Sequence, residues 1–432
     1  MRFSRREFLA TAAVLTAAGT VPTWLLSRPD EPRAGWRPEH VILVDWDGFD
    51  PAYLYRTPTP NLDTLASRGS LSIAEGTFPT ISNPSRGSMS TGAYPEVHGN
   101  AAYYLDRESG RVVGEERTLH AETVAEALVG AGKTLASVQW YMVQDRGAAF
   151  GDPDRLYVEP GGLFGTRVDA AIDILEGRPV DSGGQAAVKV PEIPHFLAIY
   201  GSDLDDLGQV EGPDGPNMAP LLAEMDRQLG RLVQATRDAS VYDRTAFIVT
   251  GDHGMTGWHR DLTPNTLAAI SAGGYVPEVV TPGEAPGSGA EVVVIPNAVR
   301  VANVALRGRA ATSQGRQQVR AALEAVPHIA KVFNQTDLKE LRAGEKLDGI
   351  VVEAEEPWGF APPGEHGGGA RGAHGSTEEM RVPLLLSGMG FRPGVAPHDA
   401  RLVDVAPTIC ALLGVRPPGD AQGRSLSEST GF

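Results

Sequence analysis

The sequence of 432 residues contains a single cysteine, Cys410, and only 6% aromatic residues. A lone cysteine cannot form an internal disulfide, so Cys410 is expected to be a small, buried, apolar residue. Basic residues are also scarce, since 38 Lys and Arg stand against 54 Asp and Glu, for a formal charge of -16. Because nucleic-acid binders concentrate Lys and Arg, this balance argues against a nucleic-acid polymer as partner. A small anionic ligand would need cations placed locally.

The N-terminal segment lacks the strongly apolar run that a stable membrane span requires. Residues 10–26 are alanine-rich and only moderately hydrophobic, and they follow the paired arginines Arg5 and Arg6. This arrangement resembles a bacterial twin-arginine export signal. We therefore expect residues 1–35 to be a signal and linker, the mature protein to have no transmembrane span, and the location to be periplasmic, cell-wall associated or secreted.

The rest of the chain has the composition of a globular protein, with 41% hydrophobic and 21% charged residues. Continuous apolar runs at residues 41–44, 195–200 and 247–250 are typical of strands buried on both faces. Residues 221–235 between two of them have the spacing of an amphipathic helix. This alternation predicts an α/β sheet with helical crossovers, in which ligands collect at the carboxyl ends of the strands.

Polar residues follow each of these three runs. Asp47 comes after the first, Asp205 and Gln209 after the second, and Asp252 with His253 after the third. A paired Asp and His, flanked by glycine, can present one oxygen and one nitrogen to a borderline metal such as zinc. Simpler interpretations remain open for the other residues: a turn aspartate before glycine for Asp47, and a solvated turn for residues 203–209.

Ser82 stands where an extended run gives way to small, helix-compatible residues. This position predicts a helix N-terminus, whose N–H groups and dipole favour an anion. A serine there could act as a nucleophile toward phosphorus or sulfur, or could simply cap the helix.

Residues 257–360 interrupt the alternation of strands and helices. A Pro- and Gly-rich stretch, two strand-like segments and a helical segment predict an inserted α+β subdomain that caps the catalytic face. The core would then comprise residues 36–256 and 361–432. A glycine-rich segment after the insertion carries two histidines, His366 and His374.

The order of these motifs resembles the alkaline phosphatase superfamily, and within it the type I phosphodiesterase and nucleotide pyrophosphatase branch. The resemblance rests on Asp47-Gly48-Phe49, on Asp252-His253-Gly254-Met255, and on residues 59–65, 78–99, 372–376 and 404–408. It implies a doubly wound α/β fold with a mostly parallel sheet flanked by helices. It also implies metal-dependent hydrolysis of a small phosphate ester, with two divalent ions that we expect to be zinc.

The resemblance further implies roles for single residues. One ion would be held by Asp47, Asp252 and His253, with Ser82 bridging as the nucleophile. The other would be held by Asp205, the residue four positions later, and His374. That residue is Gln209, where the family carries a histidine; an amide is a poor zinc ligand, so this site should bind zinc weakly or prefer a harder ion.

Two further residues could compensate for Gln209, namely Glu211 and His366. The family also uses an Asn downstream of the nucleophile to hold a substrate oxygen. Asn100 is the nearest candidate, although Tyr103 falls at the usual offset.

Other functions remain compatible with the sequence. Ser82-Asn83-Pro84-Ser85-Arg86 is similar to the sulfatase signature, which would give a formylglycine at position 82, held by Arg86, and one calcium ion. Against this, Gln139-Trp140-Tyr141 replaces the usual Gly-Lys-Trp-His type of stretch, and Trp46 separates two aspartates that are adjacent in sulfatases. Phosphonate hydrolysis is a lesser alternative. The Gln209 departure also allows an exported binding protein on a degenerate scaffold.

Overall fold

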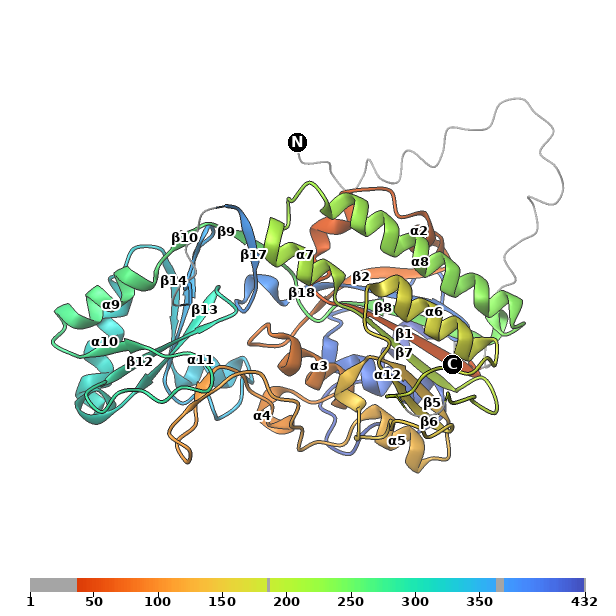
Figure 1. The fold of residues 1–432 in the computed structure, drawn as a ribbon, viewed down its shortest axis with the longest axis horizontal. Helices are drawn as coiled ribbons and strands as arrows, with labels where there is room; N and C mark the ends of the chain where they lie inside the picture. Colours follow the sequence, from red (N-terminus) through yellow and green to blue (C-terminus); the bar gives the residue numbers. More distant parts are fainter. Residues whose placement is uncertain (1–36, 185–186, 363–368, 431–432) are drawn as a thin grey trace, which may run out of the picture.

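The computed structural model describes residues 37–184, 187–362 and 369–430 (Figure 1). The expected export signal and His366 lie outside these residues. A seven-stranded sheet has the order β2-β18-β8-β1-β7-β5-β6. The bounds of its strands are β1 His40–Trp46, β2 Gly69–Glu75, β5 Leu135–Val138, β6 Arg155–Val158, β7 Phe196–Gly201, β8 Thr245–Thr250 and β18 Arg381–Gly388.

The central strand β1 runs parallel to both of its neighbours, with Val44 opposite Ile199 of β7 and Val249 of β8. Strand β18 runs antiparallel to β8 and to β2. The sheet is therefore mostly parallel, which confirms the predicted fold class.

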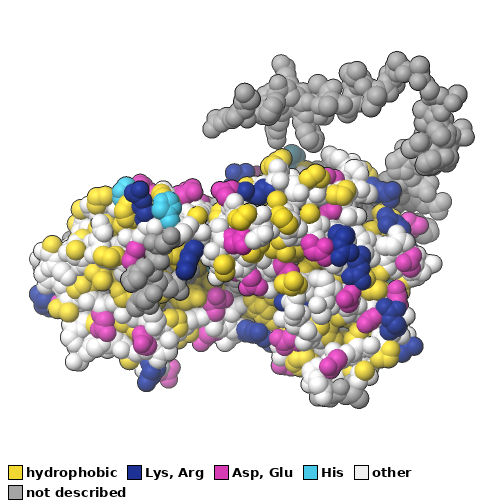
Figure 2. Space-filling model, turned by 45° about the horizontal axis from the view of Figure 1, so that its top comes forward, with side chains coloured by type: hydrophobic (Ala, Val, Ile, Leu, Met, Phe, Trp, Pro, Cys, Tyr) yellow, Lys and Arg dark blue, Asp and Glu magenta, His cyan; other side chains and the backbone are white. Residues whose placement is uncertain are grey.

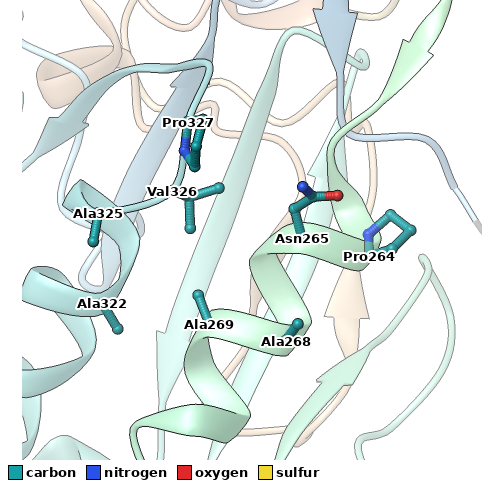
Figure 3. Close-up of a pocket in the computed structure, with 8 residues that line it drawn as sticks. All are labelled: Pro264, Asn265, Ala268, Ala269, Ala322, Ala325, Val326 and Pro327. Carbon is teal, nitrogen blue, oxygen red and sulfur yellow. The ribbon is translucent and has the colours of Figure 1, made fainter.

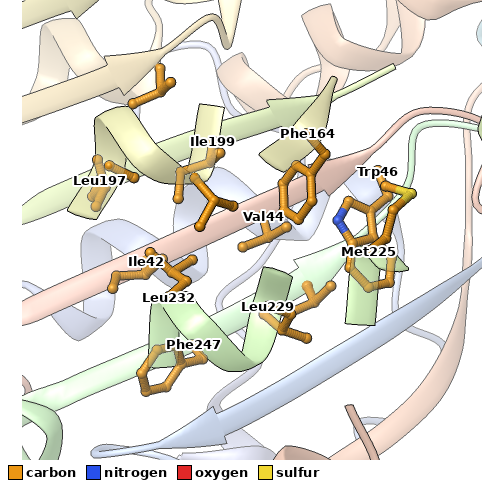
Figure 4. Packing of buried hydrophobic residues seen from close by; sticks show 14 of the residues in the cluster. Ile42, Val44, Trp46, Phe164, Leu197, Ile199, Met225, Leu229, Leu232 and Phe247 are labelled. Atoms are coloured by element: carbon orange, nitrogen blue, oxygen red, sulfur yellow. The ribbon is translucent and has the colours of Figure 1, made fainter. Parts of the chain in front are cut away.

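Helices cover both faces of this sheet because successive side chains of a buried strand point to opposite faces. Ile42, Val44 and Trp46 pack toward helices α2 (Pro60–Ser67), α6 (Phe164–Leu175) and α8 (Met218–Asp238) (Figure 4). Val41 and Leu43 face the opposite layer, which contains α5 (Val124–Gly130) and α12 (Val405–Leu412). Cys410 of α12 is buried in that layer, as expected for the only cysteine of the sequence.

Two elements differ from the pattern expected from the sequence. The helical spacing of Val124, Leu128 and Val129 predicts a helix over residues 118–132. Helix α5 begins only at Val124, because Thr123 caps it and forms a reciprocal capping box with Glu126. Residues 203–209, for which the sequence allows either cation binding or a solvated turn, lie in helix α7 (Asp203–Glu211), whose first turn is acidic.

The interrupted region forms a second sheet with the order β11-β12-β13-β15-β14. It lies beside the larger sheet, on the left in Figure 1. Its strands are β11 Pro277–Val279, β12 Val292–Asn297, β13 Val301–Leu306, β14 Ile329–Phe333 and β15 Ile350–Ala354, and the helices of this region are α9 Thr263–Ala272, α10 Ser313–Glu324 and α11 Gln335–Glu340. The first of the two strand-like segments expected in this region, residues 292–306, is a β-hairpin of β12 and β13.

A pocket of about 410 Å³ lies between α9 and α10 (Figure 3). It is lined by Ala, Val and Pro side chains and by Asn265, none of which is ionisable. This pocket therefore lacks acid, base and metal-ligating groups among the residues that line it.

The second sheet directly contacts the part of the core that contains His374. Val299, between β12 and β13, forms a parallel bridge with His374, and the Arg300 N–H donates to the His374 carbonyl. A short hairpin of β3 (Tyr104–Leu105) and β4 (Val112–Val113) also packs on the second sheet. Both contacts link residues after Ser82 and around His374 to the inserted region.

The face of the molecule shown in Figure 2 carries acidic and basic side chains interspersed rather than in one patch. Within the described ranges, no helix is both long and apolar enough to cross a membrane.

Candidate metal centre around Ser82

Ser82 is the first residue of helix α3 (Ser82–Thr91), as the sequence predicts. Ile81 before it is extended, so the chain turns into the helix at the serine itself. The Ser82 Oγ lies 3.4 Å from His253 Nε2. The hydroxyl thus sits at the positive end of a helix and beside an imidazole nitrogen.

Asp47 and Asp252 approach this nitrogen from the ends of two neighbouring parallel strands. Asp47 Oδ1 and Asp252 Oδ2 each lie 3.4 Å from His253 Nε2. The other oxygen of Asp252, Oδ1, accepts hydrogen bonds from the backbone N–H groups of Gly48 and His253. Gly48 has a φ of +69°, which glycine adopts without strain, and a Cβ there would lie 3.1 Å from the Asp205 Cα.

Backbone carbonyls fix the orientation of both histidines. His253 Nδ1 lies 2.9 Å from the Gly254 oxygen, and His374 Nδ1 lies 2.8 Å from the Thr80 oxygen. Because a carbonyl only accepts, each Nδ1 carries a proton, and Nε2 is the nitrogen that a neutral ring would offer to a metal. The His253 and His374 rings stack with centroids 3.8 Å apart, so their two Nε2 atoms lie close together.

Asp205 and Gln209 lie one turn apart on α7, which puts them on the same face of the helix. Asp205 Oδ1 is 3.7 Å from His374 Nε2, and Asp205 Oδ2 accepts a hydrogen bond of 2.7 Å from Gln209 Nε2. The amide of Gln209 therefore contacts a carboxylate where the family pattern has an imidazole.

The electrostatics of the cluster suit cation binding. Burial and the neighbouring His374 lower the pKa of His253 to about 3, so its imidazole is neutral near pH 7. Burial raises the pKa of Asp205 and of Asp252 well above the ordinary range, against the opposing effect of Arg86. Burial also acts to raise the pKa of Asp47, but Arg86, His253 and hydrogen bonds outweigh it and lower that pKa to about 2.

The raised pKa values of Asp205 and Asp252 determine how the stability of the fold changes with pH. A carboxyl group whose folded pKa exceeds its unfolded pKa stabilises the fold at low pH, and this stabilisation is lost as pH rises through the folded value. Asp205 and Asp252 therefore disfavour the metal-free fold once they ionise. A bound cation would offset that cost.

Three buried oxygens of the cluster have no hydrogen-bond partner: Asp47 Oδ1, Asp205 Oδ1 and Asp252 Oδ2. Such atoms are costly unless something else satisfies them. Ligand atoms of Asp47, Asp252 and His253 lie within 4.8 Å of one another, as do those of Asp205, His253 and His374. Carboxylate oxygens with neutral imidazole nitrogens are a fitting donor set for one or two divalent ions such as zinc.

Asn100 has a different setting from the one expected. Its Nδ2 donates to the backbone oxygens of Glu116 and Thr118, at 2.8 and 3.0 Å. Both amide protons are thereby engaged, so Asn100 holds this segment in place and has no N–H left for a substrate oxygen.

Tyr103 and Glu115 approach the helix N-terminus instead. The Glu115 carboxylate lies near the backbone N–H of Asn83 and the Tyr103 hydroxyl. Burial and this carboxylate raise the pKa of Tyr103 above its ordinary value. Glu115 lies in an irregular loop, so no motif in the sequence indicates it.

A fold of this topology with an Asp/His cluster around a helix-terminal serine defines a metal-dependent hydrolase of the alkaline phosphatase type. The family described as type I phosphodiesterase/nucleotide pyrophosphatase matches residues 41–377, and the chain belongs to that family. It is therefore a phosphoric ester hydrolase of the phosphodiesterase and pyrophosphatase kind. This membership argues against the sulfatase alternative and against the binding-protein alternative.

Individual relatives agree with this membership. The chain is 22% identical to human ectonucleotide pyrophosphatase/phosphodiesterase family member 5, over 95% of this chain and 80% of the relative. It is 25% identical to the bis(5'-adenosyl)-triphosphatase of Xenopus laevis, over 87% of this chain and 78% of the relative.

Solved structures show the same fold. The human member 5 structure superposes with a TM-score of 0.69 at 20% identity, covering 90% of this chain and 99% of that one. An inactive murine member 5 in complex with AMP gives a TM-score of 0.68 at 20% identity, with the same coverage.

Proposed function

We propose that this protein cleaves a phosphodiester or pyrophosphate bond of a small nucleotide-like molecule, with Ser82 as the nucleophile and zinc as the ion. The observation that carries the proposal is the convergence of three buried carboxylate oxygens without a hydrogen-bond partner and two histidine Nε2 atoms beside the Ser82 hydroxyl. The names of the relatives, a nucleotide pyrophosphatase and a bis-adenosyl triphosphatase, support a nucleotide-like substrate.

In this proposal Asp47, Asp252 and His253 hold one ion, and Asp205, His374 and Gln209 hold the second. The ions would supply Lewis acidity and positive charge at the reacting phosphate. Ser82 Oγ forms a bond to phosphorus as the bond to the leaving oxygen breaks. In this first step the Ser82 hydroxyl releases its proton to solvent and the leaving oxygen takes one up. Water then cleaves the phosphoserine ester: its oxygen bonds to phosphorus, the bond from phosphorus to Ser82 Oγ breaks, and Oγ regains a proton.

Glu115 favours a diester over a monoester in this mechanism. Its carboxylate lies at the N-terminus of α3, where the phosphate would approach Ser82. A dianionic monoester is repelled more strongly by this charge than a singly charged diester is. We also propose that residues 1–35 direct export, so that the protein works outside the cytoplasm.

A substrate panel tests the function. Purified protein with added zinc, manganese or calcium should hydrolyse bis(p-nitrophenyl) phosphate and diadenosine triphosphate faster than p-nitrophenyl phosphate, and p-nitrophenyl sulfate least. Replacing Glu115 by Gln should narrow the diester-to-monoester ratio of kcat/KM about tenfold, since one repulsive charge is lost. Glu116→Gln, which alters the neighbouring carboxylate that pairs with Lys346, is the matched control and should leave the ratio unchanged.

Replacing Gln209 by His should strengthen the second ion site. Imidazole is a better zinc ligand than an amide, and position 209 already contacts Asp205. We expect the dissociation constant for the weaker zinc ion to fall about tenfold or more, measured by competition with a chromophoric chelator. Gln209→Glu offers a harder ligand as comparison; equal zinc affinity in all three proteins would show that position 209 does not ligate the ion.

A further inference from the structure

Arg86 is a fully buried cation in direct contact with the proposed ion site. It lies one helical turn after Ser82 on α3 and is 0% exposed. Its Nε donates to Asp45 Oδ2 at 2.7 Å, and its Nη2 lies 3.0 Å from Asp47 Oδ2 and 3.2 Å from Asp252 Oδ2. The guanidinium also lies over the Tyr200 ring, 4.3 Å from its centroid.

The contacts of Arg86 select which oxygens remain for an ion. Asp47 Oδ2 is held by Arg86 and by the Tyr200 hydroxyl at 2.6 Å, so only Oδ1 stays free. Asp252 Oδ1 is held by two backbone N–H groups, so Oδ2 faces both Arg86 and His253. Each carboxylate thus presents one oxygen to the site.

The position of Arg86 has a second consequence. The carboxyl groups of Asp45, Asp47 and Asp252 surround this single guanidinium. A divalent ion would be a second cation beside the same residues. The guanidinium and the ion would share Asp47 and Asp252, and two cations on shared ligands repel each other.

From this arrangement we propose that Arg86 is a positioning residue that opposes ion binding electrostatically while it holds the carboxylates assembled in the absence of an ion. The inference rests on the proposed metal centre. Asp45 would weaken the repulsion between Arg86 and the ion, because the Asp45 carboxylate pairs with Arg86 and with the Trp140 indole rather than with His253. Removing the guanidinium charge should tighten ion binding, and removing the Asp45 charge should weaken it.

The test measures zinc affinity of the metal-free full chain by chelator competition. Arg86→Met should bind zinc about tenfold more tightly than the natural protein, and the isosteric Asp45→Asn about tenfold more weakly. Arg167→Met is the matched control, because Arg167 is also buried against the Tyr200 ring but donates to Tyr200 O, Gly162 O and Ser202 Oγ. It should leave zinc affinity unchanged.

Changes of the same sign in Arg86→Met and Asp45→Asn, or no change in either, would overturn the proposal. If Arg86→Met does not fold, Asp45→Asn decides alone, and unchanged or tighter binding by that variant overturns it. Failure of the natural protein to bind any divalent ion would instead refute the metal centre itself. The two failures are therefore distinguishable.

Discussion

Replacement of Ser82 by alanine should lower kcat for a phosphodiester by roughly 10⁴-fold or more, the size of loss seen when a nucleophile is removed. The Ser82 Oγ is the hydroxyl that lies beside His253 Nε2 at the start of α3. Alanine removes this oxygen without disturbing the helix, because the adjoining Ile81 makes no side-chain cap and Ser82 is the first helical residue. The measurement is kcat at saturating ion and substrate, with zinc affinity as a second readout.

Ser90→Ala is the matched control for this substitution. Ser90 lies in the same helix, is buried, and its hydroxyl donates to the Gly87 carbonyl of that helix. Its loss should leave kcat within about twofold of the natural value. Substantial turnover by Ser82→Ala would exclude a serine ester intermediate, and a formylglycine mass at position 82 in the natural protein would indicate sulfatase chemistry instead.

The fold is predictable from the sequence because its main signals are local. Residues 41–44 are apolar without interruption, and a strand with that pattern needs helices on either side. Ile42 and Val44 indeed face one helical layer, while Val41 and Leu43 face the other. The helix over residues 203–211 is not predictable in the same way, because its acidic first turn is equally typical of a solvated loop until packing is known.

The candidate site is only partly predictable, for a physical reason. Asp47, Asp252 and His253 follow buried parallel strands, so the sheet itself brings them together. Asn100 and Glu115 lie in irregular chain after α4 (Pro95–His98), where position depends on contacts with distant segments rather than on periodicity. Asn100 therefore has the residue type and nearly the spacing expected of a substrate-binding asparagine, although its side chain is engaged by backbone carbonyls.

Replacement of Asp252 by asparagine should be almost as damaging as loss of the nucleophile. The Asp252 Oδ1 accepts from the Gly48 and His253 N–H groups, which keeps an oxygen in that place. The new Nδ2 must then replace Oδ2, where it would point N–H groups at Arg86 Nη2 and into the ion site. We expect zinc stoichiometry to fall and kcat/KM to drop at least roughly 10³-fold, more than the 10- to 100-fold typical of outer partners.

Asp226→Asn separates this effect from the general consequence of altering a buried aspartate. Asp226 is 2% exposed and accepts hydrogen bonds from Asn61 and from the Leu62 N–H, but it contacts no residue of the ion site in these interactions. Its substitution should lower the thermal midpoint while zinc stoichiometry, measured by elemental analysis, stays unchanged. Because Asp252→Asn removes a charge beside Arg86, zinc added in excess should restore little activity. Full restoration by excess zinc would mean that Asp252 contributes affinity alone and that its geometry is dispensable for turnover.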